Sequence, residues 1–235
     1  MLASIYPIYT WSKDLIFAGK TERVVLLVEY RGEIEQETGR RRKPRTAARD
    51  IELSVWLEPH VSLTEAHGGR AIEAGGRMYR FELANLRAGQ RKMLALELTH
   101  GSMPAGVHDA IWVQWKFRQP SGERLRELPI EKLRLESCHH TGVLVPGSPG
   151  YVDKHLELLK SDETRELALR LRLSGREEEA REELKRRADS LLLMAARTGD
   201  PKLLTEAESM YKQSDFPGNA RALKKHEQSR TSGIL

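Results

Sequence analysis

The spacing of apolar residues changes at about Gly147–Gly150 of this chain. Before this point apolar and polar residues alternate, as in LSVWLEP at 53–59, and after it they follow a helical spacing, as in REEEAREELKRRADSLLLMAAR at 176–197. Alternation is typical of a strand with one buried face, and a period of about 3.6 is typical of an amphipathic helix. The sequence therefore predicts a mainly β fold with α: an antiparallel immunoglobulin-like β-sandwich at 1–146, followed by a segment of about three helices at 147–235.

Turn residues divide the first part into short runs. Gly68-Gly69, Gly75-Gly76, Arg87-Ala88-Gly89 and Pro120-Ser121-Gly122 separate alternating segments, and turn signals every 8–12 residues or so are typical of a sandwich. We expect one or two strands within residues 2–32. Residues 33–49 have few apolar side chains and carry acidic residues followed by basic ones. They predict a long surface loop or a disordered stretch, and a point at which a domain can be inserted.

Helix boundaries are marked in the second part. Gly175 and Gly199 follow helical segments, and Asp200 and Pro201 suit the N-cap and first position of a third helix. In the middle helix, five small or apolar residues share one face: Ala180, Leu184, Ala188, Leu191 and Ala195. We expect ion pairs four residues apart on its surface, Glu177–Arg181 and Glu183–Arg187.

The composition sets limits on the class of protein. Charged residues make up 31% of the chain and the net charge is +5, which permits an acidic partner without requiring one. With one cysteine, Cys138, no disulfide can form within the chain, as suits a reducing compartment. The start of the chain lacks a basic segment followed by an apolar run, and no stretch approaches the roughly 18–20 apolar residues of a membrane span. We expect a cytoplasmic protein with no membrane span.

The residues offer no constellation typical of an enzyme. No G-x-S-x-G string and no phosphate-binding glycine loop occurs. Cys138, His139 and His140 are zinc-type ligands, but adjacent side chains of an extended segment point to opposite sides and do not easily share one ion. The sequence therefore predicts no catalytic residue, no cofactor and no metal.

Two groups of residues are candidates for interaction. The first is a basic cluster, and it consists of Arg40, Arg41, Arg42, Lys43 and Arg45. It suits nucleic-acid phosphates, or it is a solvated loop neutralised by the acidic residues that precede it. The second consists of Trp112 and Trp115, which alternation places on opposite faces of one strand. Together with Trp56 they are either packed within the sheets or available to a partner.

Most of the chain resembles a known family in pattern. Residues 60–98, 110–136, 174–191 and 199–213 resemble the part of bacterial von Willebrand factor type A proteins that lies outside their metal-binding domain. The family's D-x-S-x-S metal string is absent. In the family, strands resembling AGKTERVVLLVEYRG and DIELSVWLEP lie before and after the metal-binding domain, and residues 33–49 fall between them. The resemblance implies the family's sandwich and helices without that domain.

These observations lead to two hypotheses of function. The first is a non-enzymatic protein-interaction or scaffold module of a von Willebrand factor A-like protein, with an unknown protein as its partner. The alternative is a nucleic-acid-binding protein that uses residues 40–49. A hydrolase has the least support from the residues. The sequence names neither the partner nor the oligomeric state.

Overall fold

The computed structural model describes residues 3–34, 46–119, 125–139 and 149–215. The chain forms two compact units, residues 1–156 and 157–235. The boundary lies within helix α1 (Pro149–Leu173), later in the chain than the change of spacing in the sequence. Each unit has an apolar core of its own.

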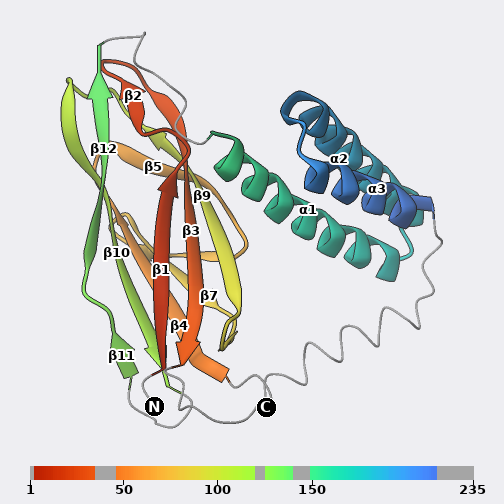
Figure 1. Cartoon of the computed structure of the whole chain (residues 1–235), viewed down its shortest axis with the longest axis horizontal. Coiled ribbons are helices and arrows are strands. Elements are labelled where there is room, and N and C mark those ends of the chain that lie inside the picture. The colour runs from red at the N-terminus through yellow and green to blue at the C-terminus, as the bar shows by residue number, and fades with distance from the viewer. Residues whose placement is uncertain (1–2, 35–45, 120–124, 140–148, 216–235) are drawn as a thin grey trace. The chain divides into compact units, whose positions relative to one another are not determined.

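The first unit is a β-sandwich of two sheets (Figure 1). Sheet A has the order β1 (Ala3–Trp11), β3 (Glu22–Ile34), β9 (Arg91–His100) and β5 (Val61–His67). Sheet B has the order β2 (Leu15–Phe17), β12 (Glu131–Cys138), β10 (Gly106–Arg118), β4 (Thr46–Leu57), β7 (Met78–Leu83) and β6 (Ala71–Gly75). Strand β11 (Leu125–Glu127) pairs with β10, and β8 (Leu86–Arg87) pairs with β4. The pairing is antiparallel as predicted, except that β12 and β2 run parallel.

Alternate residues of the two sheets form the core of the sandwich. Leu53 and Val55 of β4, Leu94 and Leu96 of β9, and Val113 of β10 are almost completely buried in it. Burying one such side chain contributes about 1.5–3 kcal/mol. These residues are the apolar members of the alternating segments, so the predicted strand character is confirmed.

The chain before β4 differs from the prediction in detail. Residues 3–34 form three strands, because β2 is separate, and both β3 and β4 extend into the range 33–49. The rest of this range, 35–45, lies outside the described residues. Strands β3 and β4 belong to different sheets, yet a Cβ atom added to Gly32 would lie 2.8 Å from the Cβ atom of Ala47. The two ends of this range are therefore close in space.

The helices begin and end close to the predicted residues. Helix α2 spans Glu177–Thr198 and α3 spans Pro201–Asp215. The side chain of Asp200 accepts a hydrogen bond from the backbone N–H of Lys202 at 2.8 Å, as an N-cap does. The face of α2 predicted to be apolar is buried, and it forms a core with Leu203, Ala207 and Met210 of α3, among others. No helix in the described part of the chain is both long and apolar enough to span a membrane.

The ion pairs of α2 are not the predicted ones. Arg181 pairs with Glu178, and Glu183 pairs with Arg186, in both cases at a spacing of three residues. Arg187 is 13% exposed, and its Nη2 lies 2.9 Å from Oε2 of Glu157 in α1. The predicted pairs are wrong, because Glu177 pairs with Arg172 of α1 and Arg187 lies on the side of α2 that packs against α1.

Candidate functional site

Trp115 lies in the core of the sandwich. It is 1% exposed, its Nε1 donates a hydrogen bond to Oη of Tyr9 at 2.8 Å, and its ring lies against Tyr30 with centroids 5.2 Å apart. Burial raises the pKa of both tyrosines well above their usual value. The contact role considered for Trp115 is therefore corrected: this side chain is enclosed between the two sheets.

Trp112 lies on the opposite face of β10, as alternation predicted, and this is the outward face of sheet B. Its register partner on β4 is Trp56. The indole Nε1 of Trp112 donates a hydrogen bond to Oε1 of Glu58 at 2.7 Å, and Nζ of Lys132 lies 4.0 Å from the centroid of the indole. The hydrogen bond and the cation–π contact hold the Trp112 ring in place on the surface of the sheet.

An apolar hollow of about 390 Å³ lies beside these rings. Ile130, on the loop before β12, is one of its lining residues and is 51% exposed. We call this the tryptophan hollow; it is lined by Trp56, Leu57, Glu58, Gly76, Trp112 and Ile130. Its lining comes from β4, the β4–β5 turn, the β6–β7 turn, β10 and the β11–β12 loop, so distant parts of the sequence form it together.

A second, polar hollow of about 510 Å³ shares Glu58 with the first. It is lined by Glu58, His60, Val107, His108, Asp109 and Arg134. Nε of Arg134 donates a hydrogen bond to Oδ1 of Asp109 at 2.7 Å, and this contact lowers the pKa of the Asp109 carboxyl. We call the two hollows together the Glu58 surface. It offers an apolar recess and a charged recess side by side.

His60, which lines the polar hollow, packs against the buried ring of His100. The rings of His60 and His100 have centroids 4.8 Å apart, and burial lowers the pKa of both. Nδ1 of His100 lies 2.8 Å from the carbonyl oxygen of Gly101. A carbonyl only accepts, so Nδ1 of His100 carries the proton and Nε2 is the bare nitrogen of a neutral ring. Both Nε2 atoms are buried without a hydrogen-bond partner among the described residues.

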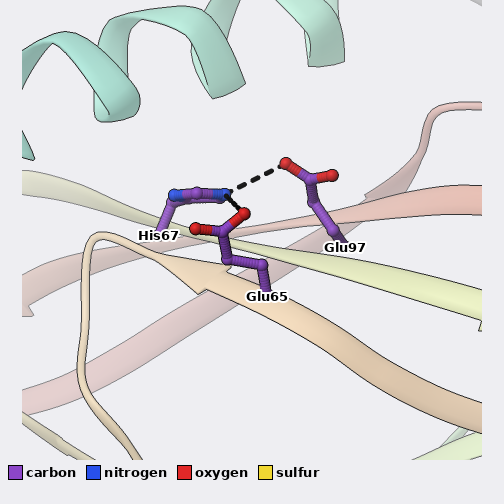
Figure 2. A group of neighbouring side chains, drawn as sticks. All are labelled: Glu65, His67 and Glu97. Atoms are coloured by element: carbon purple, nitrogen blue, oxygen red, sulfur yellow. Dashed lines mark hydrogen bonds and ion pairs between the residues drawn. The ribbon is translucent and has the colours of Figure 1, made fainter.

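A separate group of chemistry-bearing side chains lies on sheet A (Figure 2). Nε2 of His67 lies 3.0 Å from Oε1 of Glu97 and 3.6 Å from Oε2 of Glu65. One potential ligand atom from each of the three residues lies within 4.8 Å of the other two. The sequence predicted no metal, and no string reveals this group, because Glu97 is 30 residues from His67 and comes from another strand.

The basic cluster Arg40, Arg41, Arg42, Lys43 and Arg45 lies outside the described residues, as does His140. Cys138 ends β12 and His139 follows it as an exposed residue. The described residues therefore place neither the predicted basic site nor the full Cys138–His140 string.

No family model matches the sequence, and no curated protein matches it. Several solved structures are similar to the chain. A von Willebrand factor type A protein from Catenulispora acidiphila is 14% identical, with a TM-score of 0.43, over 66% of this chain and 37% of its own. The ArnB paralog VWA2 from Sulfolobus acidocaldarius is 9% identical, with a TM-score of 0.46, over 91% of this chain and 98% of its own.

The ACE19 collagen-binding subdomain of the Enterococcus faecalis surface protein ACE is 7% identical, with a TM-score of 0.37, over 56% of this chain and 98% of its own. The present chain spans well under half the length of the Catenulispora acidiphila protein. These likenesses are too remote to place the chain in a family.

Proposed function

We propose that this chain is a non-enzymatic protein-interaction module whose contact surface is the Glu58 surface. The observation that carries the proposal is the pair of tryptophans, Trp56 and Trp112, on the outward face of sheet B. Their indoles line an apolar hollow beside a carboxylate, and Ile130 at its rim is 51% exposed. Large aromatic side chains in pockets account for much of the binding free energy of protein interfaces.

The chemistry of this surface specifies the kind of partner segment. The tryptophan hollow takes an apolar side chain, because water displaced from Trp56, Trp112 and Ile130 contributes about 25 cal/mol per Å² of apolar area buried. Glu58 is an acceptor for N–H donors on the partner. The Trp112 ring is already held by Glu58 and Lys132, so little side-chain freedom is lost when a partner binds.

The more specific part of the proposal concerns the kind of protein to which this chain would belong. We propose, from the sequence resemblance, that the chain is the accessory part of a von Willebrand factor A-like protein, and that it functions in the cytoplasm. The two ends of the range 33–49 approach each other at Gly32 and Ala47. Loop-closure entropy rises only logarithmically with length, so a sandwich of this kind carries or loses a domain there at little cost. The nucleic-acid alternative gains no support from the described surface.

The interaction proposal can be tested with a photo-crosslinking amino acid. Ile130 is 51% exposed beside the hollow, and Leu125 is 46% exposed on β11, outside both hollows. A p-benzoylphenylalanine at position 130 should give discrete protein adducts in an extract of the source cells, and the same probe at position 125 should not. Trp112→Ala should abolish the adducts at position 130 while leaving the folded chain intact by circular dichroism.

Equal adducts at positions 130 and 125, or adducts at 130 that persist in Trp112→Ala, would contradict a specific role for the Glu58 surface. Turnover of a substrate by the purified chain would contradict the non-enzymatic assignment.

A further inference from the structure

A β-bulge in β5 determines which side chains lie on the outward face of sheet A. Before the bulge, Leu63 is opposite Leu98 and packs against the core. The register then shifts between Leu63 and Glu65, with Thr64 as the extra residue, and Ala66 becomes the core-facing residue opposite Leu96. An extra residue reverses the side-chain alternation. Without it, Glu65 and His67 would point into the core; with it, they lie on the outward face.

The same register places two carboxylates directly opposite each other. Glu65 of β5 is the cross-strand partner of Glu97 of β9, and His67 is diagonal to Glu97 on the same face. Like charges opposite each other on adjacent strands destabilise a sheet. A cation bound between the two carboxylates removes this repulsion, and the nitrogen that faces both of them is Nε2 of His67 (Figure 2).

The distances suit a small divalent ion. Ligand atoms about 2.0–2.1 Å from a tetrahedral zinc ion are about 3.3 Å from one another. The two distances from Nε2 of His67 to the glutamate oxygens, 3.0 and 3.6 Å, lie on either side of that value. His67 is 2% exposed, so its ring is held by its surroundings, whereas the side chain of Glu65 is 62% exposed and reachable from solvent.

We propose that Glu65, His67 and Glu97 form a binding site for a divalent transition-metal ion of the zinc class, with a fourth position open to water. One imidazole and two carboxylates are a donor set that zinc accepts, and three protein ligands leave such a position. The site lies on sheet A and the Glu58 surface lies on sheet B, so this proposal stands apart from the proposed interaction function.

A proton is the competing occupant of the site. Nε2 of His67 lies at hydrogen-bond distance from the Glu97 carboxylate, which only accepts, so an ion bound there would displace the proton that Nε2 donates. The two occupants differ in their response to pH, because ion binding at a histidine weakens as the pH falls and the ring takes up a proton. The test therefore measures binding at two pH values.

The experiment uses the full chain after treatment with a chelator, with Zn²⁺ in calorimetry and Co²⁺ as a visible-light probe. We expect one ion per chain at pH 7.5, and weaker binding at pH 5.5. Glu97→Gln should weaken binding by about tenfold or more. Loss of a residue that only supports a metal ligand already weakens metal binding by about tenfold or more, and loss of the ligand itself should weaken it further. The matched control is Glu82→Gln, because Glu82 is likewise opposite a glutamate, Glu52, but in sheet B. It should bind the ion as the unaltered chain does.

A second measurement needs no substitution. In the unaltered chain, one equivalent of Zn²⁺ should shift the imidazole ¹⁵N resonance of His67 while those of His60 and His100 stay in place. Absence of stoichiometric binding at pH 7.5 would overturn the proposal. An unchanged affinity in Glu97→Gln, or a shift at other histidines in place of His67, would overturn it as well.

Discussion

At the scale of single residues, Trp112 and Trp115 show how position along a strand sets the role of a side chain. They are three residues apart on β10, and so they lie on opposite faces of sheet B. Trp115 is 1% exposed and donates to Tyr9 within the core, whereas Trp112 lines the tryptophan hollow and donates to Glu58. The same residue type therefore stabilises the fold at one position and forms a surface at the other.

Replacing the two tryptophans by phenylalanine separates these roles. Trp115→Phe leaves a cavity and leaves the partly buried hydroxyl of Tyr9 without its donor, so the free energy of unfolding should fall by roughly 1–3 kcal/mol. Trp112→Phe removes a partly exposed contact and should cost less than about 1 kcal/mol. Urea unfolding followed by circular dichroism measures both. An equal loss in the two variants would show that Trp115 is not the more strongly packed side chain.

The pH dependence of stability should depend in part on His100. Burial lowers the pKa of His100 in the folded chain, and the rings of His60 and His108 lower it further, while the Gly101 carbonyl and the Glu22 carboxylate oppose the shift. In the unfolded chain the pKa is about 6.5. The unfolded state therefore binds more protons as the pH falls through about 6.5, and stability is lost until the folded pKa is passed.

We expect His100→Gln to make the free energy of unfolding less dependent on pH between pH 7 and pH 5. One titrating group contributes at most about 1.4 kcal/mol per pH unit. Urea titrations at several pH values measure the slope, and His139→Gln, at an exposed position on the same sandwich, is the control. A slope that is the same in His100→Gln and the unaltered chain would contradict the prediction.

At the scale of elements, the backbone of β3 at Gly32 lies very close to strands β8 and β4. A Cβ atom there would lie 2.7 Å from the carbonyl oxygen of Arg87 and 2.8 Å from the Cβ atom of Ala47. The N–H of Gly32 donates to the carbonyl of Gln90 at 3.1 Å. Only glycine fits without displacing backbone atoms, so the two sheets meet at a position that tolerates no side chain.

Gly32→Ala should lower the free energy of unfolding by about 1–3 kcal/mol, the usual cost of overpacking. Gly150→Ala is the matched control: nothing lies within 4 Å of an added Cβ atom there, and the position is in helix α1. Alanine favours helix over glycine, so the control should be neutral or slightly stabilising. Thermal unfolding compares the two variants, and equal melting temperatures would argue against the close approach at Gly32.

The pairing of α2 with α3 depends on one face of α2. Leu191 is 0% exposed in the helical core, and Leu193, two residues later, is 66% exposed. Leu191→Ala should destabilise the helical unit by about 2–5 kcal/mol, whereas Leu193→Ala should change its stability by less than about 0.5 kcal/mol. Loss of helical circular dichroism on heating measures the difference. If the two variants melt alike, the assignment of the buried face is wrong.

At the scale of the whole molecule, the two cores share no residue. Helix α1 contributes to both units, and in the first unit its Tyr151 hydroxyl contacts the Glu29 carboxylate, which also pairs with Arg91. Burial, together with the hydrogen bond to Glu29, raises the pKa of Tyr151. The molecule is therefore organised as two separately packed units joined by a continuous helix.

Two separate cores predict that substitutions in each act independently. Combining Trp115→Phe with Leu191→Ala should give a loss of stability equal to the sum of the single losses within about 0.5 kcal/mol. In calorimetry on the full chain, Trp115→Phe should lower the temperature at which the sandwich unfolds, and Leu191→Ala should lower the temperature at which the helices unfold. If either substitution shifted both transitions equally, the units would be a single cooperative structure.

Much of this architecture could be predicted from local patterns. Alternation predicted strands in the segments that form β4, β9 and β10, and the helical spacing identified the buried face of α2. Asp200 and Gly199 marked helix ends, because caps depend on backbone groups only a few residues away. The patterns failed at Arg187, whose partner Glu157 is 30 residues earlier.

The candidate sites depended on the tertiary structure. The Glu58 surface combines residues of β4, β10, β12 and three loops, and no local spacing relates Trp56 to Trp112 or Glu58 to Arg134. At Glu65 and His67 the single extra residue of the bulge reversed the alternation on which the sequence argument relied. The sequence by itself determined the class of the longer elements and the buried face of α2, because both follow from periodicity along the chain. Only the tertiary structure decided which side chains meet across strands, because strand register is set by packing between residues far apart in sequence.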